Sequence, residues 1–301
     1  MTDHGRKPIR WANDLNTLLA AVAAATAQPR FPVRVADLAL EISRSRFPDS
    51  PVIAVEGGSL GDFEGALYPM PDRKGWAILY NKDVSPGRKH FTIAHEFGHY
   101  LMHRPLFPEG IQCSEESVTF RDGPELEAEA DEFAAYLLMP FDDFRSQLPA
   151  DAVPSLDDLS AAAERYGVSL IACILRWLEY TSRRSMLVVA RDGFVLWAKP
   201  SKPAYKSGLF IRTRKASPYE IPANSLVGRR NLADIGREGV DHPAGVWFDE
   251  PCTEITLHSD KYDQSLALLH FQKSAPRFSI YEEPEQDTFD RFSPKPRDRF
   301  E

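Results

Sequence analysis

The stretch His95-Glu96-Phe97-Gly98-His99 carries the most specific information in this sequence of 301 residues. On an α-helix, residues four positions apart lie one turn above each other, so both imidazoles face the same point. Two neutral imidazole nitrogens at that spacing can share one Zn²⁺, with the intervening glutamate beside it. The pentad therefore predicts a helix that carries two metal ligands, His95 and His99, and a candidate general base, Glu96.

The residues around the pentad favour a buried helix. Apolar side chains dominate positions 91–94 before it and 100–102 after it. In a buried helix each polar group of the pentad needs a partner, because an unsatisfied buried polar group costs on the order of 1–3 kcal/mol. A metal ion with a base beside it satisfies all of them, whereas the alternative is an exposed helix with two histidines. Gly98 costs about 1 kcal/mol against alanine in a helix, which predicts that something passes close to that face.

A catalytic zinc site uses three protein ligands and leaves one position open. His103 follows His99 by four residues, but three consecutive turns of one straight helix cannot wrap a tetrahedral ion. The outer histidines would lie about 12 Å apart along the helix axis. We therefore expect the third ligand to come from another part of the chain.

A second helix, expected at 124–139, is rich in carboxylates. Glu127 and Asp131 share one stripe of this helix, while Glu129 points to roughly the opposite side at 100° per residue. A carboxylate ligand with an aspartate one turn later suits a metal site, because a metal-bound histidine needs an acceptor behind it. An acidic surface face is the alternative interpretation. Together with the pentad, the pattern favours Glu127 as the ligand and Asp131 as the acceptor.

Two blocks of the sequence resemble the core of the ImmA/IrrE metallopeptidases. They are NKD at 81–83 with RKHFTIAHEFGHYLMH at 88–103, and EAEADEFAAYLLMP at 127–140. The resemblance covers about residues 30–183. It implies zinc ligands at His95, His99 and Glu127, with Glu96 as the base. The family commonly has asparagine where this chain has Asp131, an exchange that keeps a hydrogen-bond acceptor.

The resemblance also implies a function. Known members are bacterial zinc-dependent endopeptidases that cut helix-turn-helix repressors and so release mobile-element or stress-response genes. A protein substrate of that kind is the partner we expect. The alternative is a non-catalytic zinc-holding regulatory or DNA-binding module. Glu96 favours the enzyme, because a structural zinc site fills its fourth position with a protein ligand and needs no base.

Composition limits the partners and the compartment. The chain has 36 basic and 44 acidic residues, for a net charge of −8, so no broad basic field indicates direct nucleic-acid binding. Cys113, Cys173 and Cys252 lie far apart without a CxxC pair, which is typical of a reducing compartment, here the cytoplasm. No apolar run approaches the roughly 18 residues that cross a bilayer. We expect no membrane association.

The order of elements predicts an α+β fold: a zincin-like metallopeptidase domain of helices and a small sheet, followed by a β-rich or mixed accessory domain. Helices are expected from Trp11 to Val22 and at 35–46, 86–103 and 124–139, and strands at 51–55, 66–68, 76–80, 186–190, 194–199, 245–248 and 254–257. The expected organisation is an N-terminal helical segment at 1–29, the zinc metallopeptidase core at 30–150, a helical pair packed on it at 151–184, a possible sensor domain at 185–281 and a disordered tail at 282–301.

Two weaker signals remain. Residues 159–180 could form a helix-turn-helix with Gly167 at the turn, but the second helix is almost wholly apolar. A base-reading helix needs polar side chains, so core packing is the favoured interpretation. Cys113 lies between the two predicted ligand helices and could cap the zinc as an inhibitory thiolate, although a plain loop residue is the simpler interpretation.

Overall fold

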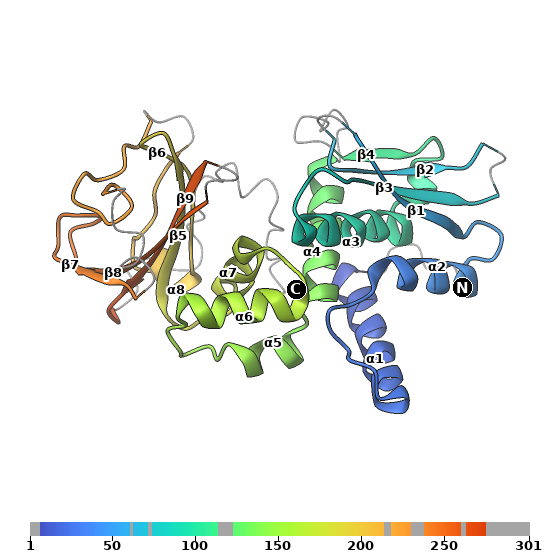
Figure 1. Cartoon of the computed structure of the whole chain (residues 1–301), viewed down its shortest axis with the longest axis horizontal. Helices are drawn as coiled ribbons and strands as arrows, with labels where there is room; N and C mark the ends of the chain where they lie inside the picture. Colours follow the sequence, from blue (N-terminus) through green and yellow to red (C-terminus); the bar gives the residue numbers. More distant parts are fainter. Residues whose placement is uncertain are drawn as a thin grey trace, which may run out of the picture. The chain divides into compact units, whose positions relative to one another are not determined.

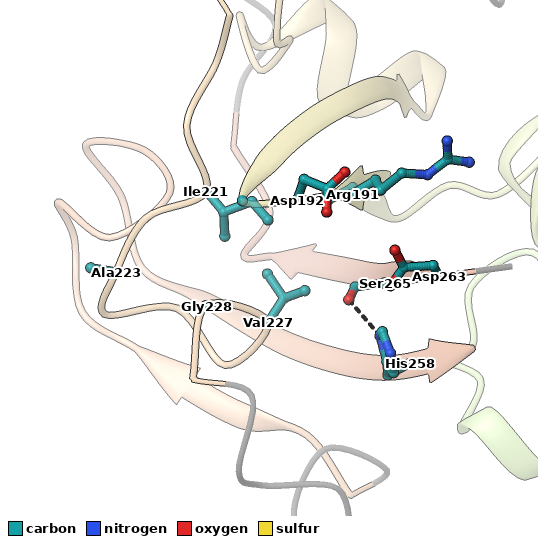
Figure 2. A pocket seen from close by; sticks show the side chains of 11 residues that line it. Arg191, Asp192, Ile221, Ala223, Val227, Gly228, His258, Asp263 and Ser265 are labelled. Atoms are coloured by element: carbon teal, nitrogen blue, oxygen red, sulfur yellow. Dashed lines mark hydrogen bonds between the residues drawn. The ribbon is translucent and has the colours of Figure 1, made fainter. Parts of the chain in front are cut away.

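The computed structural model describes residues 7–60, 63–71, 74–113, 123–213, 218–229, 238–259 and 263–274. These residues form two compact units (Figure 1). The first comprises the described residues up to Asp143 together with Ala163–Ser169. The second comprises Phe144–Ala162 and the described residues from Leu170 onward. The tail expected at 282–301 lies outside the described residues.

The first unit combines helices with a four-stranded sheet. Its elements are α1 (Pro8–Thr26), α2 (Val35–Arg46), β1 (Val52–Gly58), β2 (Gly65–Pro69), β3 (Trp76–Asn81), α3 (Pro86–Met102), η1 (Arg104–Leu106), β4 (Ile111–Cys113) and α4 (Gly123–Leu138). The strand order is β1-β3-β2-β4, with β1 parallel to β3 and the other pairs antiparallel. Helix α3 packs against β2 and β3, and α4 packs against α3 (Figure 1).

The sequence around α3 explains where this helix begins and ends. The Ser85 side chain caps the helix by accepting a hydrogen bond from the backbone N–H of Arg88, and Pro86 occupies the first turn. His103 stands at the C-terminal cap, with Pro105 just beyond it. The buried residues of α3 run from Thr92 to Leu101 and include the whole pentad. The pentad therefore lies on a buried helix.

Helix α1 covers α4 with one apolar face. Trp11 and Leu15 are fully buried, while Leu18 and Val22 remain exposed. The Asn16 side chain donates a hydrogen bond to the backbone carbonyl of Tyr136, 2.9 Å away. This buried polar contact fixes α1 against the helix that carries the acidic residues.

The second unit is built on a five-stranded antiparallel sheet in the order β6-β5-β9-β8-β7. The elements that follow α4 along the chain are α5 (Phe141–Gln147), α6 (Leu156–Tyr166), α7 (Leu170–Leu178), β5 (Arg184–Arg191), β6 (Phe194–Pro200), α8 (Lys202–Lys206), β7 (Val240–His242), β8 (Cys252–Ser259) and β9 (Gln264–Phe271). One face of the sheet forms a core with Met186, Val188, Trp247 and Leu269. Both units mix helix and sheet, so the chain is α+β with a sheet domain toward its C-terminal side.

Helices α6 and α7 occupy the segment 159–180, which the sequence analysis considered as a possible helix-turn-helix. Gly167 between them has φ of +65°, a backbone conformation that glycine adopts readily. Cys173, Ile174 and Trp177 of α7 are buried, so the apolar face of this helix packs into a core. Among the described helices, none has the length and apolar character that crossing a membrane requires.

The strand expected at 245–248 is wrong. Gly245 has φ of +92°, and its N–H donates to the carbonyl of Phe248, so the segment turns. Trp247 belongs to this turn and is buried, and its indole N–H donates a hydrogen bond to Oε2 of Glu254 over 2.8 Å. The apolar residues at 245–248 contribute to a core from a turn. Their composition is therefore that of a strand, although the backbone is not extended. The sequence patterns also do not predict β4, α5, α8, β7 or β9.

Candidate metal centre

Helix α3 brings the two histidines of the pentad together. The Nε2 atoms of His95 and His99 lie 3.0 Å apart, and both residues are buried. Glu96 is also fully buried. Its side chain lies beside β2, because a Cβ atom on Gly65 would be 2.6 Å from Oε1 of Glu96. Gly65 therefore gives this carboxylate its space.

Helix α4 supplies the third candidate ligand. Glu127 places Oε2 3.1 Å from Nε2 of His95 and Oε1 3.4 Å from Nε2 of His99. Among the described residues, His95, His99 and Glu127 form a cluster in which one ligand atom from each lies within 4.8 Å of the others. The close approach predicted at Gly98 is that of α4, since a Cβ atom there would lie 2.9 Å from Phe133.

Asp131 stands behind the first histidine, as its stripe on α4 predicts. Its Oδ1 lies 2.8 Å from Nδ1 of His95. Burial raises the pKa of the Asp131 carboxyl, while the hydrogen bond with His95 lowers it. In its ionised form Asp131 would accept the proton of Nδ1 and leave Nε2 of His95 with its lone pair. This is the arrangement that a metal-binding histidine requires.

Glu129 was expected on roughly the opposite side of α4 from Glu127 and Asp131, yet its side chain reaches the end of α3. Its Oε2 lies 3.1 Å from Nε2 of His103, and Nδ1 of His103 lies 2.9 Å from Nδ1 of His99. The helical wheel fixes the direction of a Cα–Cβ bond but not the reach of a long side chain toward a residue at the end of the neighbouring helix. His103 is thus a buried neighbour of a ligand, and it is not a member of the cluster.

The electrostatics of the cluster suit a cation. Burial lowers the pKa of His99 to about 4, so its imidazole is neutral at pH 7. Burial raises the pKa of Glu127, but hydrogen bonds and charge from His95 and His99 outweigh that effect and hold the pKa well below its usual range. A neutral imidazole and an ionised carboxylate are the protonation states that metal ligation needs.

The spacing of the donor atoms also fits zinc. The corners of a tetrahedron around Zn²⁺, with ligand atoms at about 2.0–2.1 Å from the ion, lie roughly 3.3 Å apart. The two histidine Nε2 atoms are 3.0 Å apart, and the two oxygens of Glu127 lie 3.1 Å from Nε2 of His95 (Oε2) and 3.4 Å from Nε2 of His99 (Oε1). Nitrogen and oxygen ligands of this kind, two histidines and one glutamate, are a zinc donor set.

Among the described side chains, the remaining sequence signals add no ligand. Cys113 pairs through its backbone with Gly65 in the β2–β4 ladder. The side chain of Cys113 lies outside the described part of the structure, so the thiolate interpretation remains a prediction. The contact between His103 and Glu129 was missed by sequence reasoning. The repeat of histidine four residues after His99 was the available signal.

Comparison with known proteins identifies a family for the part of the chain that carries these residues. Residues 52–178 match the IrrE N-terminal-like domain, the peptidase M78 family. The matching part of the chain belongs to the ImmA/IrrE family. This IrrE-like domain contains both ligand helices and the whole donor cluster. The family is metallopeptidase-like, and the His-His-Glu cluster is compatible with zinc.

The comparisons with solved structures and with curated proteins do not extend this family assignment. A solved structure described as a Mycobacterium tuberculosis transcriptional regulator is similar at 16% identity, with a TM-score of 0.49, over 86% of this chain and 76% of that chain. A likeness of this size does not extend the role of that protein to this one. No curated protein matches the chain.

Proposed function

We propose that this protein is a zinc-dependent endopeptidase with a zincin-like catalytic domain. The observation that carries the proposal is the convergence of His95, His99 and Glu127, one ligand atom of each lying within 4.8 Å of the others, with Glu96 on the same helix as the two histidines. A purely structural site would fill its fourth position with a protein ligand. Among the described residues the cluster has three members.

The residues of the chain have separate roles in this proposal. His95, His99 and Glu127 would hold the metal, and Asp131 orients His95. When bound, zinc would supply a Lewis acid that polarises the scissile carbonyl and acidifies water. Glu96 would take a proton from the attacking water and deliver it to the leaving amine. Its burial beside Gly65 keeps this carboxylate in one place.

We further propose that the substrate is a helix-turn-helix repressor and that the protein acts in the cytoplasm. The resemblance to the ImmA/IrrE enzymes motivates the substrate. The buried free thiols Cys173 and Cys252 accord with a reducing compartment. The net charge of −8 and the buried apolar face of α7 argue against direct DNA reading by this chain. The unit built on β5–β9 would be the accessory, possibly sensing, part.

The metal assignment is tested on the purified protein. Wild type should contain close to one zinc per chain by elemental analysis. His95→Ala, His99→Ala and Glu127→Gln should each lose most of it, with unchanged far-UV circular dichroism. Glu125→Gln, an exposed glutamate of the same helix, is the matched control. Full zinc occupancy in the His95→Ala/His99→Ala double variant would refute the assignment.

The catalytic assignment is tested with Glu96→Gln. This variant should keep zinc and fold but lose cleavage of a repressor encoded beside the gene by at least about 10²–10⁴-fold, the contribution of general-base catalysis. The readout is the size of the co-expressed repressor on a gel. Equal derepression by wild type and Glu96→Gln with an uncut repressor would instead support the alternative, a non-catalytic zinc-holding module.

A further inference from the structure

We propose that His103 and Glu129 form a relay that positions His99 for metal binding. The inference rests on the proposed metal centre and concerns residues that lie outside its ligand set. His95 contacts a carboxylate directly, through Asp131, whereas His99 is connected to one through a second imidazole. The two ligands of one helix are thus supported by two different chains of hydrogen bonds.

The direction of the relay follows from the chemistry of its two ends. Glu129 is a carboxylate and can only accept, so the contact of 3.1 Å places a proton on Nε2 of His103. The Nδ1 atom of a neutral His103 then carries a lone pair. It accepts the Nδ1–H of His99 over 2.9 Å. The Nε2 atom of His99 is left with its lone pair on the side of His95 and Glu127.

The opposite placement of protons would block the site. If His103 donated from Nδ1, His99 would carry its proton on Nε2, which lies 3.0 Å from Nε2 of His95 and 3.4 Å from Oε1 of Glu127. A protonated nitrogen cannot bind a metal ion. The relay therefore selects the tautomer of His99 that can act as a ligand. Its effect passes through His99, so His103 and Glu129 are positioning residues.

Burial makes the selection strong. His99 and His103 are 1% and 2% exposed, and their rings meet edge to face with centroids 5.0 Å apart. Water has little access to either Nδ1 atom, so a lost partner is not replaced by solvent. Glu129 is the exposed end of the relay, at 36% of its side chain. Its removal therefore has a smaller effect than removal of His103.

The experiment measures zinc affinity by competition with a chromophoric chelator, independently of any cleavage. His103→Phe fills the imidazole volume but cannot accept a hydrogen bond, and it should weaken zinc binding by about 10–100-fold. His103→Asn returns an acceptor oxygen near the position of Nδ1 and should restore most of the affinity. Glu129→Ala should weaken binding by less than His103→Phe, and Glu125→Ala on the same helix should have no effect.

Two further readouts separate positioning from packing. The double variant His103→Phe/Glu129→Ala should bind no more weakly than His103→Phe, because both changes interrupt the same relay. Long-range ¹H–¹⁵N spectra of the zinc-loaded wild type should show His99 protonated on Nδ1. In the spectra of Glu129→Ala that signal should be weakened. Unfolding in urea verifies that each variant is folded, and the surface position of Glu129 protects that variant from misfolding.

The outcomes distinguish the relay from the site it serves. Wild type without zinc would overturn the metal centre and the relay together. Zinc-binding wild type with unchanged affinity in both His103→Phe and Glu129→Ala would overturn the relay alone. Additive losses in the double variant, or equal losses in His103→Phe and His103→Asn, would also overturn it. An inactive but zinc-binding wild type would refute the peptidase and leave the relay testable by every measurement above.

Discussion

Gly98 of α3 faces the ring of Phe133 on α4 so closely that a Cβ atom on the glycine would lie 2.9 Å from Cδ1 of that ring. The same Cβ atom would be 3.4 Å from Cα of Ala130. The two ligand helices therefore approach each other where α3 has no side chain. This separation lets Glu127 reach both His95 and His99.

Gly98→Ala should weaken zinc binding by about tenfold. Alanine gains about 1 kcal/mol of helix propensity, but overpacking at a tight contact costs about 1–3 kcal/mol and moves α4 away. Chelator competition and urea unfolding measure the two effects. Adding Phe133→Leu, which removes the crowding ring, should restore part of the affinity. Wild-type affinity in Gly98→Ala would show that the helix separation does not control the site.

Gly65→Ala should damage catalysis while leaving the metal bound. The new Cβ would lie 2.6 Å from Oε1 of Glu96 and 2.5 Å from Cγ2 of Thr92, so the carboxylate must move. Repressor cleavage should fall at least about tenfold, since misplacement of a base by 1 Å costs on the order of 10²-fold. Gly58→Ala in β1 is the control, because its nearest neighbour would be 3.4 Å away. Loss of zinc in Gly65→Ala would contradict this division of roles.

Substitutions of Asp131 should separate hydrogen bonding from charge. Asp131→Asn keeps an acceptor for Nδ1 of His95, so zinc affinity should stay within a few-fold of wild type. Asp131→Ala removes the acceptor and should weaken binding by about 10–100-fold. Isothermal titration with zinc measures both. If the asparagine variant is as weak as the alanine variant, the negative charge of Asp131, and not its hydrogen bond, supports the site.

His270 should make the second unit less stable in acid. Its burial, aided by the charge of Arg183, lowers its pKa to about 4 from the ordinary 6.5. The folded state therefore binds fewer protons than the unfolded state. The stability from His270 is complete above pH 6.5 and is lost as the pH falls toward 4. Between pH 7.5 and pH 5 the loss should be about 1–2 kcal/mol.

Urea unfolding at these two pH values tests the contribution of His270. His270→Gln should reduce the difference in unfolding free energy, even if the loss of the edge-to-face contact with Trp177 lowers stability at pH 7.5. His258→Gln, at an exposed position of the neighbouring strand β8, should leave the difference unchanged. The same pH dependence in wild type and His270→Gln would assign the acid sensitivity to other groups.

Local patterns predicted the ligand helices well. A pentad with helical spacing and a carboxylate stripe are properties of single helices, so they are readable before the helices meet. The position of Glu129 could not be derived in this way, because its contact depends on how α4 crosses the end of α3. The turn at 245–248 was misread for a similar reason. Its apolar residues serve a core whose other side, near Met186 and Leu269, comes from distant parts of the chain.

The order of strands in the second sheet limits which strand pairs can form while the chain is being synthesised. β9 is the central strand, between β5 and β8, although it follows all the others along the chain. On the ribosome, only the separate β5–β6 and β7–β8 pairs can form before Gln264–Phe271 emerges, and each has an unpaired edge. The metal ligands emerge much earlier. Under the proposed function, a nascent chain could bind zinc while its second sheet still has unpaired strand edges. Termination before β9 would release a fragment that carries the candidate ligands but lacks the central strand of that sheet.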